Sequence, residues 1–157
     1  MKIDYQKSLS ALVAGIGGMT CITTISFLNI HSSIPWLMAS FGATMVILFV
    51  LPSSPLARPR NIIFGHIITT IIGLVILKLL GVNEWSMGIA VGLAILLMIL
   101  SDTIHPPAGA NPLIVMLSDQ HWDFLFMPVI SGTLLIVFIG YFFHRFISKK
   151  EYPDKWF

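Results

Sequence analysis

The segment between Asp102 and Pro112 holds the residues of this chain that are best suited to chemistry. It places the carboxylate of Asp102 three residues before the imidazole of His105, and two prolines, Pro106 and Pro107, follow the histidine. A histidine can hydrogen-bond to an anion or carry a proton, whereas prolines interrupt a helix and free backbone groups. Ionisable side chains and a broken backbone are costly in apolar surroundings. We therefore interpret this segment as the centre of a functional site.

The rest of the composition is that of a membrane protein. Of the 157 residues, 56% are hydrophobic and only 10% are charged, and the mean hydropathy is +0.90. Soluble domains carry about 25% charged residues. No Asp, Glu, Lys or Arg occurs between Lys7 and Arg58. The composition therefore predicts an integral membrane protein, and the net charge of +2 is too small to indicate a nucleic-acid partner.

Six apolar segments predict an all-α membrane protein, with residues 1–157 forming a single transmembrane domain. They cover residues 8–30, 36–51, 62–80, 86–100, 105–117 and 124–143. The segments at 36–51 and 105–117 are short for a hydrocarbon core of about 30 Å, because a helix rises about 1.5 Å per residue. Two arrangements are open: six crossings with short or broken helices, or four full spans with two re-entrant segments.

The basic residues favour six crossings. They lie near the N-terminus, in the loop that contains Arg58 and Arg60, and after residue 143. Loops rich in Lys and Arg stay on the cytoplasmic side of a membrane. Six crossings place all three groups on that side, whereas four spans leave the arginine loop outside. We expect both termini to be cytoplasmic and the protein to lie in a bacterial inner (plasma) membrane.

Two triplets in the short segments resemble each other and predict an internal repeat. Gly42-Ala43-Thr44 aligns with Gly109-Ala110-Asn111, and prolines precede both triplets. The repeats would cover residues 8–80 and 86–143. With three spans each, the two halves would have opposite orientations, as in transporters built from inverted repeats. The alternative is that so short a match arises by chance.

The repeat predicts a solute site between two short helices. The triplets would open these helices from opposite sides of the membrane, where free N–H groups and partial positive charge suit a small anion. Glycine lets the backbone approach a solute, while Thr44 and Asn111 would line the site or cap their helices. The predicted substrate-binding residues are Gly42, Ala43, Thr44, Arg60, His105, Gly109, Ala110 and Asn111.

Arg60, Asp102 and His66 have further roles in this prediction. Arg60 would coordinate an anion at the cytoplasmic mouth, or serve only as an anchor at the membrane interface. If a helix continues to His105, Asp102 shares its face and the two side chains can hydrogen-bond. We expect Asp102, His105 and His66 to gate the site or relay a proton, although His66 is also explained as a satisfied buried histidine. His144, near the end of the last segment, is expected to mark the interface.

No enzymatic activity, metal or cofactor is predicted. The chain has no HxxxH or CxxC pair, P-loop, GxSxG motif or dinucleotide fingerprint. Two alternatives stay open: a membrane metal-dependent enzyme that uses Asp102 and His105, and a membrane subunit that transports nothing. The expected partners are the lipid bilayer and a small inorganic anion. Because a small bundle leaves little room for a pore, we also expect a homo-oligomer.

Three motifs in the same order resemble the HPP family of integral membrane proteins. They are Thr103 to Ala110, Ser40 to Thr44, and Ser54 to Asn61 followed by Gly65-His66, and the resemblance covers about residues 5–148. The family more often has Gln at the position of Arg58, so we rely on Arg60. The family is usually described with four spans, and plant and cyanobacterial members are associated with nitrite transport. The resemblance therefore implies a channel or secondary transporter for a small anion, with nitrite as the first candidate.

Overall fold

The structure is a computed structural model that describes residues 4–156, and these residues form an all-α protein without strands. The main helices are α1 (Tyr5–His31), α2 (Ala39–Val50), α3 (Pro59–Leu80), α4 (Glu84–Leu100), α5 (Asn111–Leu117) and α6 (Ser131–Phe143). Shorter helical segments are η1 (Pro55–Ala57), η2 (Pro106–Ala110), η3 (Leu125–Ile130) and η4 (His144–Ser148). The prediction of an all-α protein with six apolar helical segments is confirmed.

Local sequence signals explain where several helices begin and end. The side chain of Asp4 accepts hydrogen bonds from backbone N–H groups at the start of α1. Pro59 occupies the first position of α3, where its missing N–H costs nothing, and Gly81 ends that helix with a φ of +66°. Asn83 and Ser86 form a reciprocal capping box at the start of α4.

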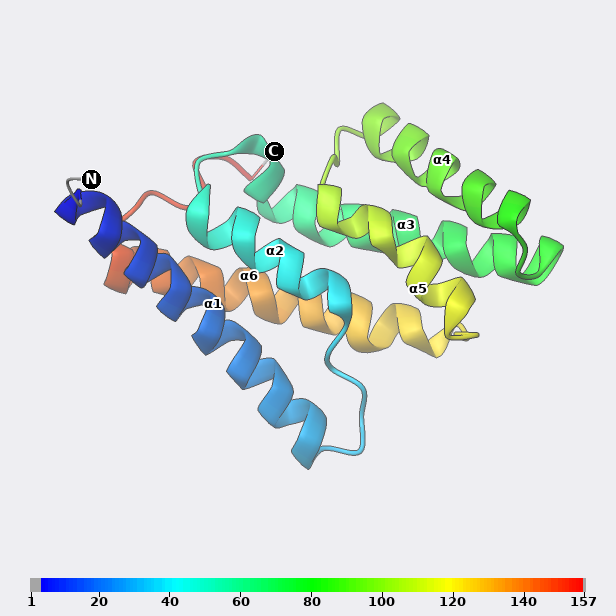
Figure 1. Ribbon diagram of the computed structural model, residues 1–157, viewed down its shortest axis with the longest axis horizontal. Coiled ribbons are helices and arrows are strands. Elements are labelled where there is room, and N and C mark those ends of the chain that lie inside the picture. The colour runs from blue at the N-terminus through cyan, green and yellow to red at the C-terminus, as the bar shows by residue number, and fades with distance from the viewer. Residues whose placement is uncertain (1–3, 157) are drawn as a thin grey trace.

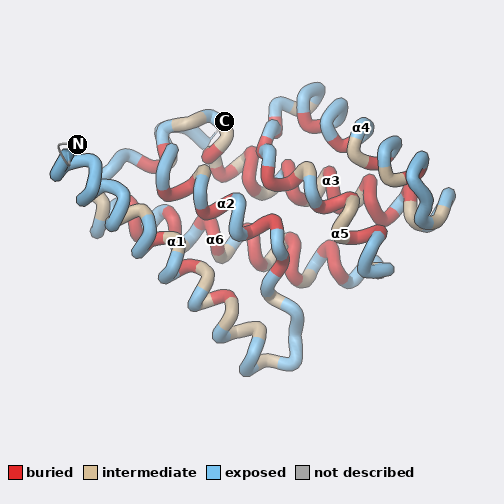
Figure 2. The backbone as a smooth tube through the Cα atoms, in the orientation of Figure 1, coloured by how far each residue is buried: buried red, intermediate tan, exposed pale blue. Residues whose placement is uncertain are grey.

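The central helix of the bundle is α3. It packs against α4, α5, α6, η2 and η3, whereas α1 packs against α2 and α6. Figure 2 shows that much of α3 is buried, while α1 and α4 expose long stretches on the outside. Close packing around α3 depends on glycine: a Cβ atom at Gly73 would lie 2.8 Å from the Cα atom of Pro112 in α5. The position of α5, which carries Asn111, is therefore fixed against the centre of α3.

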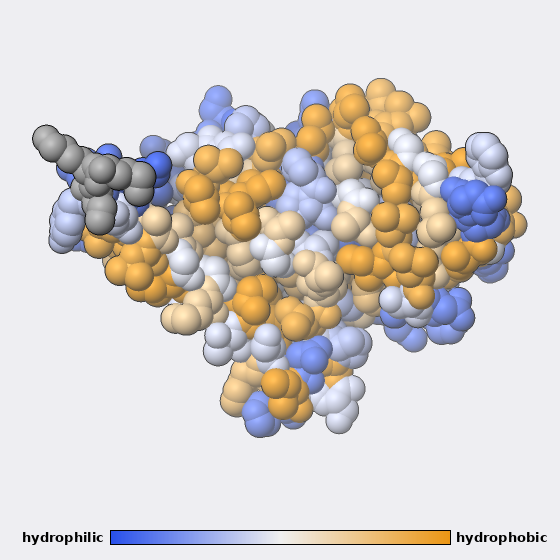
Figure 3. Space-filling model, in the orientation of Figure 1, coloured by the Kyte–Doolittle hydropathy of each residue, from blue (hydrophilic) through white to orange (hydrophobic). Residues whose placement is uncertain are grey.

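Several loops and the termini lie toward the two ends of the bundle. The N-terminus, the 51–58 loop and the C-terminal tail lie toward the left in Figure 1, and the turns at 81–83 and 118–123 lie at the right. The arginine loop and both termini therefore lie toward the same side of this view, and six crossings stay a prediction. Figure 3 shows a largely hydrophobic face with hydrophilic side chains gathered near the ends and at the loop after α1.

Three of the described helical segments are long and apolar enough to cross a membrane. They are α1, α3 and the continuous segment Leu125–Ser148, which comprises η3, α6 and η4. The helices α2 and α4 are shorter apolar helices, and α5 has seven residues. The helices α2 and α5 are therefore short, as the sequence predicts for residues 36–51 and 105–117.

Corresponding helices of the two halves run in opposite directions. In Figure 1, α2 runs from the middle toward the left and α5 from the middle toward the right, and α3 and α6 are likewise opposed. The starts of α2 and η2 both lie near the middle of the view. These directions are those of an inverted repeat, although common ancestry of residues 8–80 and 86–143 stays a prediction.

His144 does not mark the membrane interface as expected. Its side chain is buried at 1% exposure, and its Nε2 atom lies 2.9 Å from the carbonyl oxygen of Leu48. The ring also packs against Phe49 and Tyr152. The expectation fails because α2 and the C-terminal tail cover this end of α6, which hydropathy along the chain does not reveal.

Candidate solute site between the short helices

His105 is fully buried and joins three parts of the chain. Its Nδ1 atom lies 2.8 Å from the carbonyl oxygen of Leu56 in η1, and its Nε2 atom lies 3.0 Å from Oγ1 of Thr44 in α2. A carbonyl oxygen only accepts, so Nδ1 carries the hydrogen and donates it. In the neutral ring, Nε2 then accepts from the Thr44 hydroxyl. Both nitrogens of His105 are therefore engaged within the protein.

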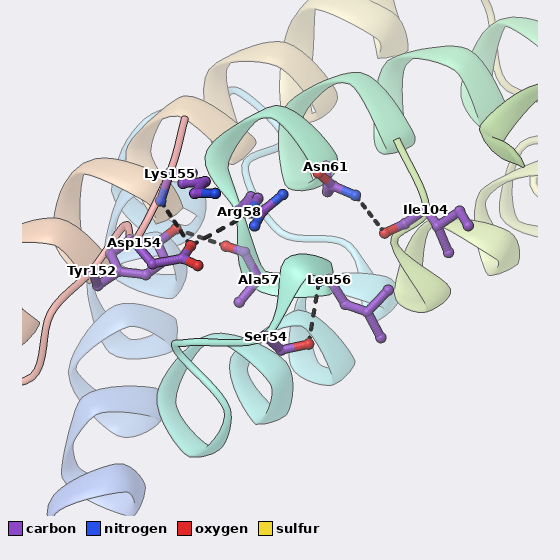
Figure 4. A network of polar contacts seen from close by, with 9 residues as sticks. All are labelled: Ser54, Leu56, Ala57, Arg58, Asn61, Ile104, Tyr152, Asp154 and Lys155. Carbon is purple, nitrogen blue, oxygen red and sulfur yellow. Dashed lines mark hydrogen bonds and ion pairs between the residues drawn. The ribbon is translucent and has the colours of Figure 1, made fainter. Parts of the chain in front are cut away.

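The chain before His105 is fastened to the start of α3. Arg60 donates from Nη2 to the carbonyl oxygen of Ser101 at 2.7 Å. Asn61 donates from Nδ2 to the carbonyl oxygen of Ile104 at 2.9 Å, as Figure 4 shows. A Cβ atom at Gly65 would lie 2.9 Å from the carbonyl oxygen of Thr103, so glycine is required at this contact. These contacts place the imidazole of His105 against α3.

Asp102 lies away from His105. Helix α4 ends at Leu100, and Asp102 is exposed with a left-handed φ of 52°. The predicted Asp102–His105 hydrogen bond required a helix through both residues, and His105 pairs with Leu56 and Thr44 instead. Asp102 lines a pocket of about 340 Å³ together with Arg58 and Arg60. We call this pocket, which lies where α3 begins, the mouth of the bundle, and Asp102 belongs to it.

His66 lies beside His105 and has one nitrogen without a partner. The centroids of the two rings are 5.0 Å apart, and the His66 side chain is 0% exposed. Its Nδ1 atom donates to the carbonyl oxygen of Ile62 at 2.8 Å, one turn earlier in α3. Its Nε2 atom has no hydrogen-bond partner among the described residues. The interpretation of His66 as a satisfied buried histidine therefore holds for one nitrogen only.

Asn111 extends this polar region along α3. Its Nδ2 atom donates to the carbonyl oxygen of His66 at 3.2 Å and to Oγ1 of Thr70 at 3.1 Å. Within residues 4–156, the buried side-chain atoms without a hydrogen-bond partner are Asn111 Oδ1, His66 Nε2 and Ser40 Oγ. An unpaired buried polar group costs about 1–3 kcal/mol. All three lie on elements that meet around α3, which marks this region as a candidate solute site.

The two glycine triplets occupy different places in their helices. Gly109 and Ala110 lie in η2 and Asn111 is the first residue of α5, but the Asn111 side chain bonds to α3 and does not cap its own helix. However, α2 begins at Ala39, so Gly42, Ala43 and Thr44 lie one turn inside the helix. The predictions that this triplet opens a helix and that Thr44 caps it are therefore wrong. The helix begins directly after Met38, whose backbone is extended. No glycine or proline stands at this point to mark the start of the helix in the sequence.

A groove separates α2 from η2 and α5. Its volume is about 930 Å³, and small side chains line much of it. The wall includes Ala39, Ser40, Ala43, Pro106, Pro107 and Ala110. A Cβ atom at Gly42 or at Gly109 would meet no atom within 4 Å. The predicted site residues thus form two sets: small residues at or near the groove, and the polar side chains of Thr44, His66, His105 and Asn111 buried behind it.

The C-terminal tail closes over the arginine loop at the mouth of the bundle. The Tyr152 hydroxyl donates to the carbonyl oxygen of Ala57 at 3.0 Å, and Nε of Arg58 lies 3.5 Å from Oδ1 of Asp154 (Figure 4). The hydrogen bond from Arg58 lowers the pKa of the Asp154 carboxyl. The loop that supplies Leu56 to His105 is therefore held from both sides.

Several residues of the site were not selected from the sequence. Ser40 and Asn61 lie inside the motifs that resemble the HPP family, so their position was available as a signal. Thr70 lies four residues after His66 and therefore on the same face of α3. The carbonyl of Leu56 carries no sequence signal, because any residue supplies one. Among the described residues, no three His, Cys, Asp or Glu side chains gather as metal ligands would.

Apolar helices packed around a buried polar region define an α-helical integral membrane protein. The profile of the family "HPP, transmembrane region" matches residues 4–153, and the chain belongs to this family. This confirms the resemblance of the three motifs.

Two transmembrane proteins of Dictyostelium discoideum are similar to the chain. One is 41% identical over 128 residues, which cover 76% of this chain and 45% of the relative. The other is 40% identical over 129 residues, which cover 77% of this chain and 42% of the relative. The chain thus spans less than half the length of these relatives. No solved structure shows significant similarity to it.

Proposed function

We propose that this chain transports a small inorganic anion, with nitrite as the first candidate, as a channel or a secondary transporter. The observation that carries the proposal is the buried polar region where both short helices meet α3. His105, Thr44, His66 and Asn111 are all 0% exposed in an otherwise apolar bundle. Polar and ionisable side chains at this depth are costly, and in membrane proteins they mark solute and proton pathways.

The arginine-lined mouth supports an anionic substrate. Arg58 and Arg60 line the 340 Å³ pocket, and their only acidic neighbour in its lining is Asp102. Arg58 also pairs with Asp154, so Arg60 is the cation that attracts anions to this narrow pocket. We assign this pocket to the cytoplasmic side, since the C-terminal tail pairs with its Arg58 and basic residues favour that side. We also propose that the protein lies in a bacterial inner membrane.

Proton relay is assigned to the two histidines rather than to Asp102. Their ring centroids are 5.0 Å apart, and the Thr44 hydroxyl connects His105 to α2. Asp102 is exposed at the mouth, where its charge acts on anion capture. The segment that carries Asp102 and His105 connects mouth and buried region, so a gating movement of this segment changes both together.

We also propose that the chain functions as a homo-oligomer. Helix α2 has 12 residues, or about 18 Å, so it ends well within a hydrocarbon core of about 30 Å. Inside a membrane, unpaired backbone N–H and C=O groups at the exposed ends of α2 must be shielded from lipid by protein. A second copy packed against α2 supplies this cover. Native mass spectrometry from micelles should show multiples of 17.4 kDa, and a fully active monomer would contradict the proposal.

A flux assay tests the transport proposal. Proteoliposomes with equal amounts of protein are given nitrite, nitrate, formate or urea, and influx is compared with that of protein-free liposomes. We expect nitrite influx above background, reduced in His105→Ala and in Arg60→Ala. The matched control is His121→Ala, because His121 is exposed and lies at the opposite end of the bundle. Background influx from well-folded protein would overturn the proposal, and a co-purifying partner would then favour the subunit alternative.

A further inference from the structure

The free nitrogen of His66 is a hydrogen-bond acceptor. Nδ1 of this ring faces the carbonyl oxygen of Ile62 at 2.8 Å and must donate to it. In a neutral imidazole the other nitrogen then presents a lone pair. That nitrogen, Nε2, is the one without a partner among the described residues. A solute that binds here must bring a hydrogen to it.

The free atom of Asn111 is an acceptor as well. Its amide nitrogen donates to the carbonyl oxygen of His66 and to Oγ1 of Thr70. Reversing the amide would set Oδ1 against the carbonyl oxygen of His66, so this orientation is fixed by the bond. Oδ1 is left buried without a partner. Two different elements, α3 and α5, thus present acceptors in one polar region.

The side chains of the same region lack what a bare anion needs. Anion sites in proteins provide N–H donors, arginine or lysine. The helices α2 and α5 and the segment η2 contain no charged residue, and α3 has Arg60 and Lys78 only near its ends. The titratable side chain that faces His66 is His105, whose Nδ1 hydrogen is already donated to Leu56. A bare anion at the buried acceptors would meet lone pairs.

We propose that the buried region receives its solute uncharged, as a small molecule that donates a hydrogen bond. This inference rests on the proposed transport function and specifies the form of the substrate. For a weak-acid anion such as nitrite, the anion takes up one proton from water at one face. The resulting acid donates its O–H to His66 Nε2 or Asn111 Oδ1 and releases the proton at the other face. One anion and one proton cross together, and no net charge moves.

Ser40 places this region within reach of a solute. Its hydroxyl is buried at 3% exposure, has no partner among the described residues, and belongs to the wall of the 930 Å³ groove. A hydroxyl can accept from a solute and also donate to it. Phe41, the next residue, packs against the His66 ring with centroids 5.6 Å apart. Ser40 therefore lies in the groove wall, next in the chain to a residue that contacts the buried histidine.

The test measures what form of the solute crosses. Proteoliposomes that contain a pH-sensitive dye receive nitrite or formate at several values of external pH. The membrane potential is held at zero or made inside-positive with potassium and valinomycin, and protein-free liposomes give the background. The inference predicts lumen acidification that rises about tenfold for each unit of falling pH, as the protonated fraction does. It also predicts no dependence on potential. An influx that follows potential and is flat in pH would overturn the inference while supporting anion transport.

A second solute separates the inference from the proposed function. Ammonia is uncharged and donates hydrogen bonds, but it has no anionic form at these pH values. Ammonia flux without nitrite or formate flux would support the uncharged-donor site and overturn anion transport. No flux of any of the three solutes above background would overturn both.

Two variants of His66 test the acceptor itself. An asparagine side chain places its amide near the position of Nδ1, so His66→Asn can keep the bond to Ile62 but removes the distal acceptor. His66→Gln places an amide near Nε2 and restores an acceptor there. We expect at least a tenfold loss of flux in His66→Asn and partial recovery in His66→Gln, with equal reconstitution and equal melting temperatures. Equal flux in both variants and in the wild type would overturn the role of His66.

Discussion

The Oγ1 atom of Thr44 and the Nε2 atom of His105 are 3.0 Å apart, although 61 residues separate them in the chain. One lies in the short helix of the first half and the other begins the short segment of the second half. Both side chains are fully buried. The hydrogen bond between them therefore fixes the two short helices relative to each other at the point where the candidate site lies.

Removing the Thr44 hydroxyl should destabilise the protein. Thr44→Val keeps the shape of the side chain but leaves Nε2 of His105 buried without a donor. Such a loss costs about 1–3 kcal/mol in the free energy of unfolding. Reversible unfolding in mixed micelles measures it. The control is Thr20→Val on the exposed face of α1, which should change stability by less than about 0.5 kcal/mol. Equal effects at both positions would contradict the buried hydrogen bond.

An alanine at Gly65 should disturb the contact between α3 and the His105 segment. Its Cβ atom would lie 2.9 Å from the carbonyl oxygen of Thr103 and 3.0 Å from Cβ of His105. Overpacking of this kind costs about 1–3 kcal/mol. Gly92→Ala in α4 is the matched control, because its Cβ atom would meet nothing within 4 Å. Thermal unfolding of both variants should separate them, and a wild-type melting temperature for Gly65→Ala would refute the close contact.

The charge of Asp102 should oppose anion capture at the mouth. Asp102 shares its pocket with Arg58 and Arg60, so Asp102→Asn makes the pocket more positive. We expect the KM for nitrite influx to fall several-fold at low ionic strength, with little change in maximal rate. The difference should shrink as salt is added, because exposed charges are screened. A collapse of the maximal rate would instead show that Asp102 acts in the relay.

The hydrogen bond from the Tyr152 hydroxyl to Ala57 should hold the C-terminal tail in place up to strongly alkaline pH. Burial raises the pKa of its phenol. Because the folded pKa is the higher one, stabilisation is complete below the ordinary value near 10 and is lost as pH rises through the raised value. The difference in absorbance at about 295 nm between wild type and Tyr152→Phe reports this ionisation. A midpoint at the ordinary pKa would show that the hydroxyl is not buried against Ala57.

The sequence predicted the helices well because their signals are local. Hydropathy located all six apolar segments, and Pro59 and Gly81 mark the two ends of α3. The start of α2 was placed wrongly, since the extended stretch before Ala39 contains only one proline, Pro35, four residues earlier. Element boundaries without a capping residue or an adjacent breaker depend on packing, which the sequence does not display.

The candidate site was predicted in its membership but not in its roles. His105 was expected to face the solute, yet both of its nitrogens pair within the protein, whereas His66 keeps a free acceptor. This exchange of roles depends on the carbonyl of Leu56, 49 residues from His105. Backbone carbonyls are the same at every residue, so only the folded structure shows which one a histidine meets.

A double-mutant cycle on nitrite influx tests most directly whether Thr44 and His105 form one transport site. Influx is measured in proteoliposomes with wild type, Thr44→Val, His105→Ala and the double variant at equal reconstitution. The shared hydrogen bond predicts that each single variant slows influx and that the double variant is no slower than His105→Ala alone. Losses that multiply in the double variant, or influx that neither single variant changes, would contradict a shared site.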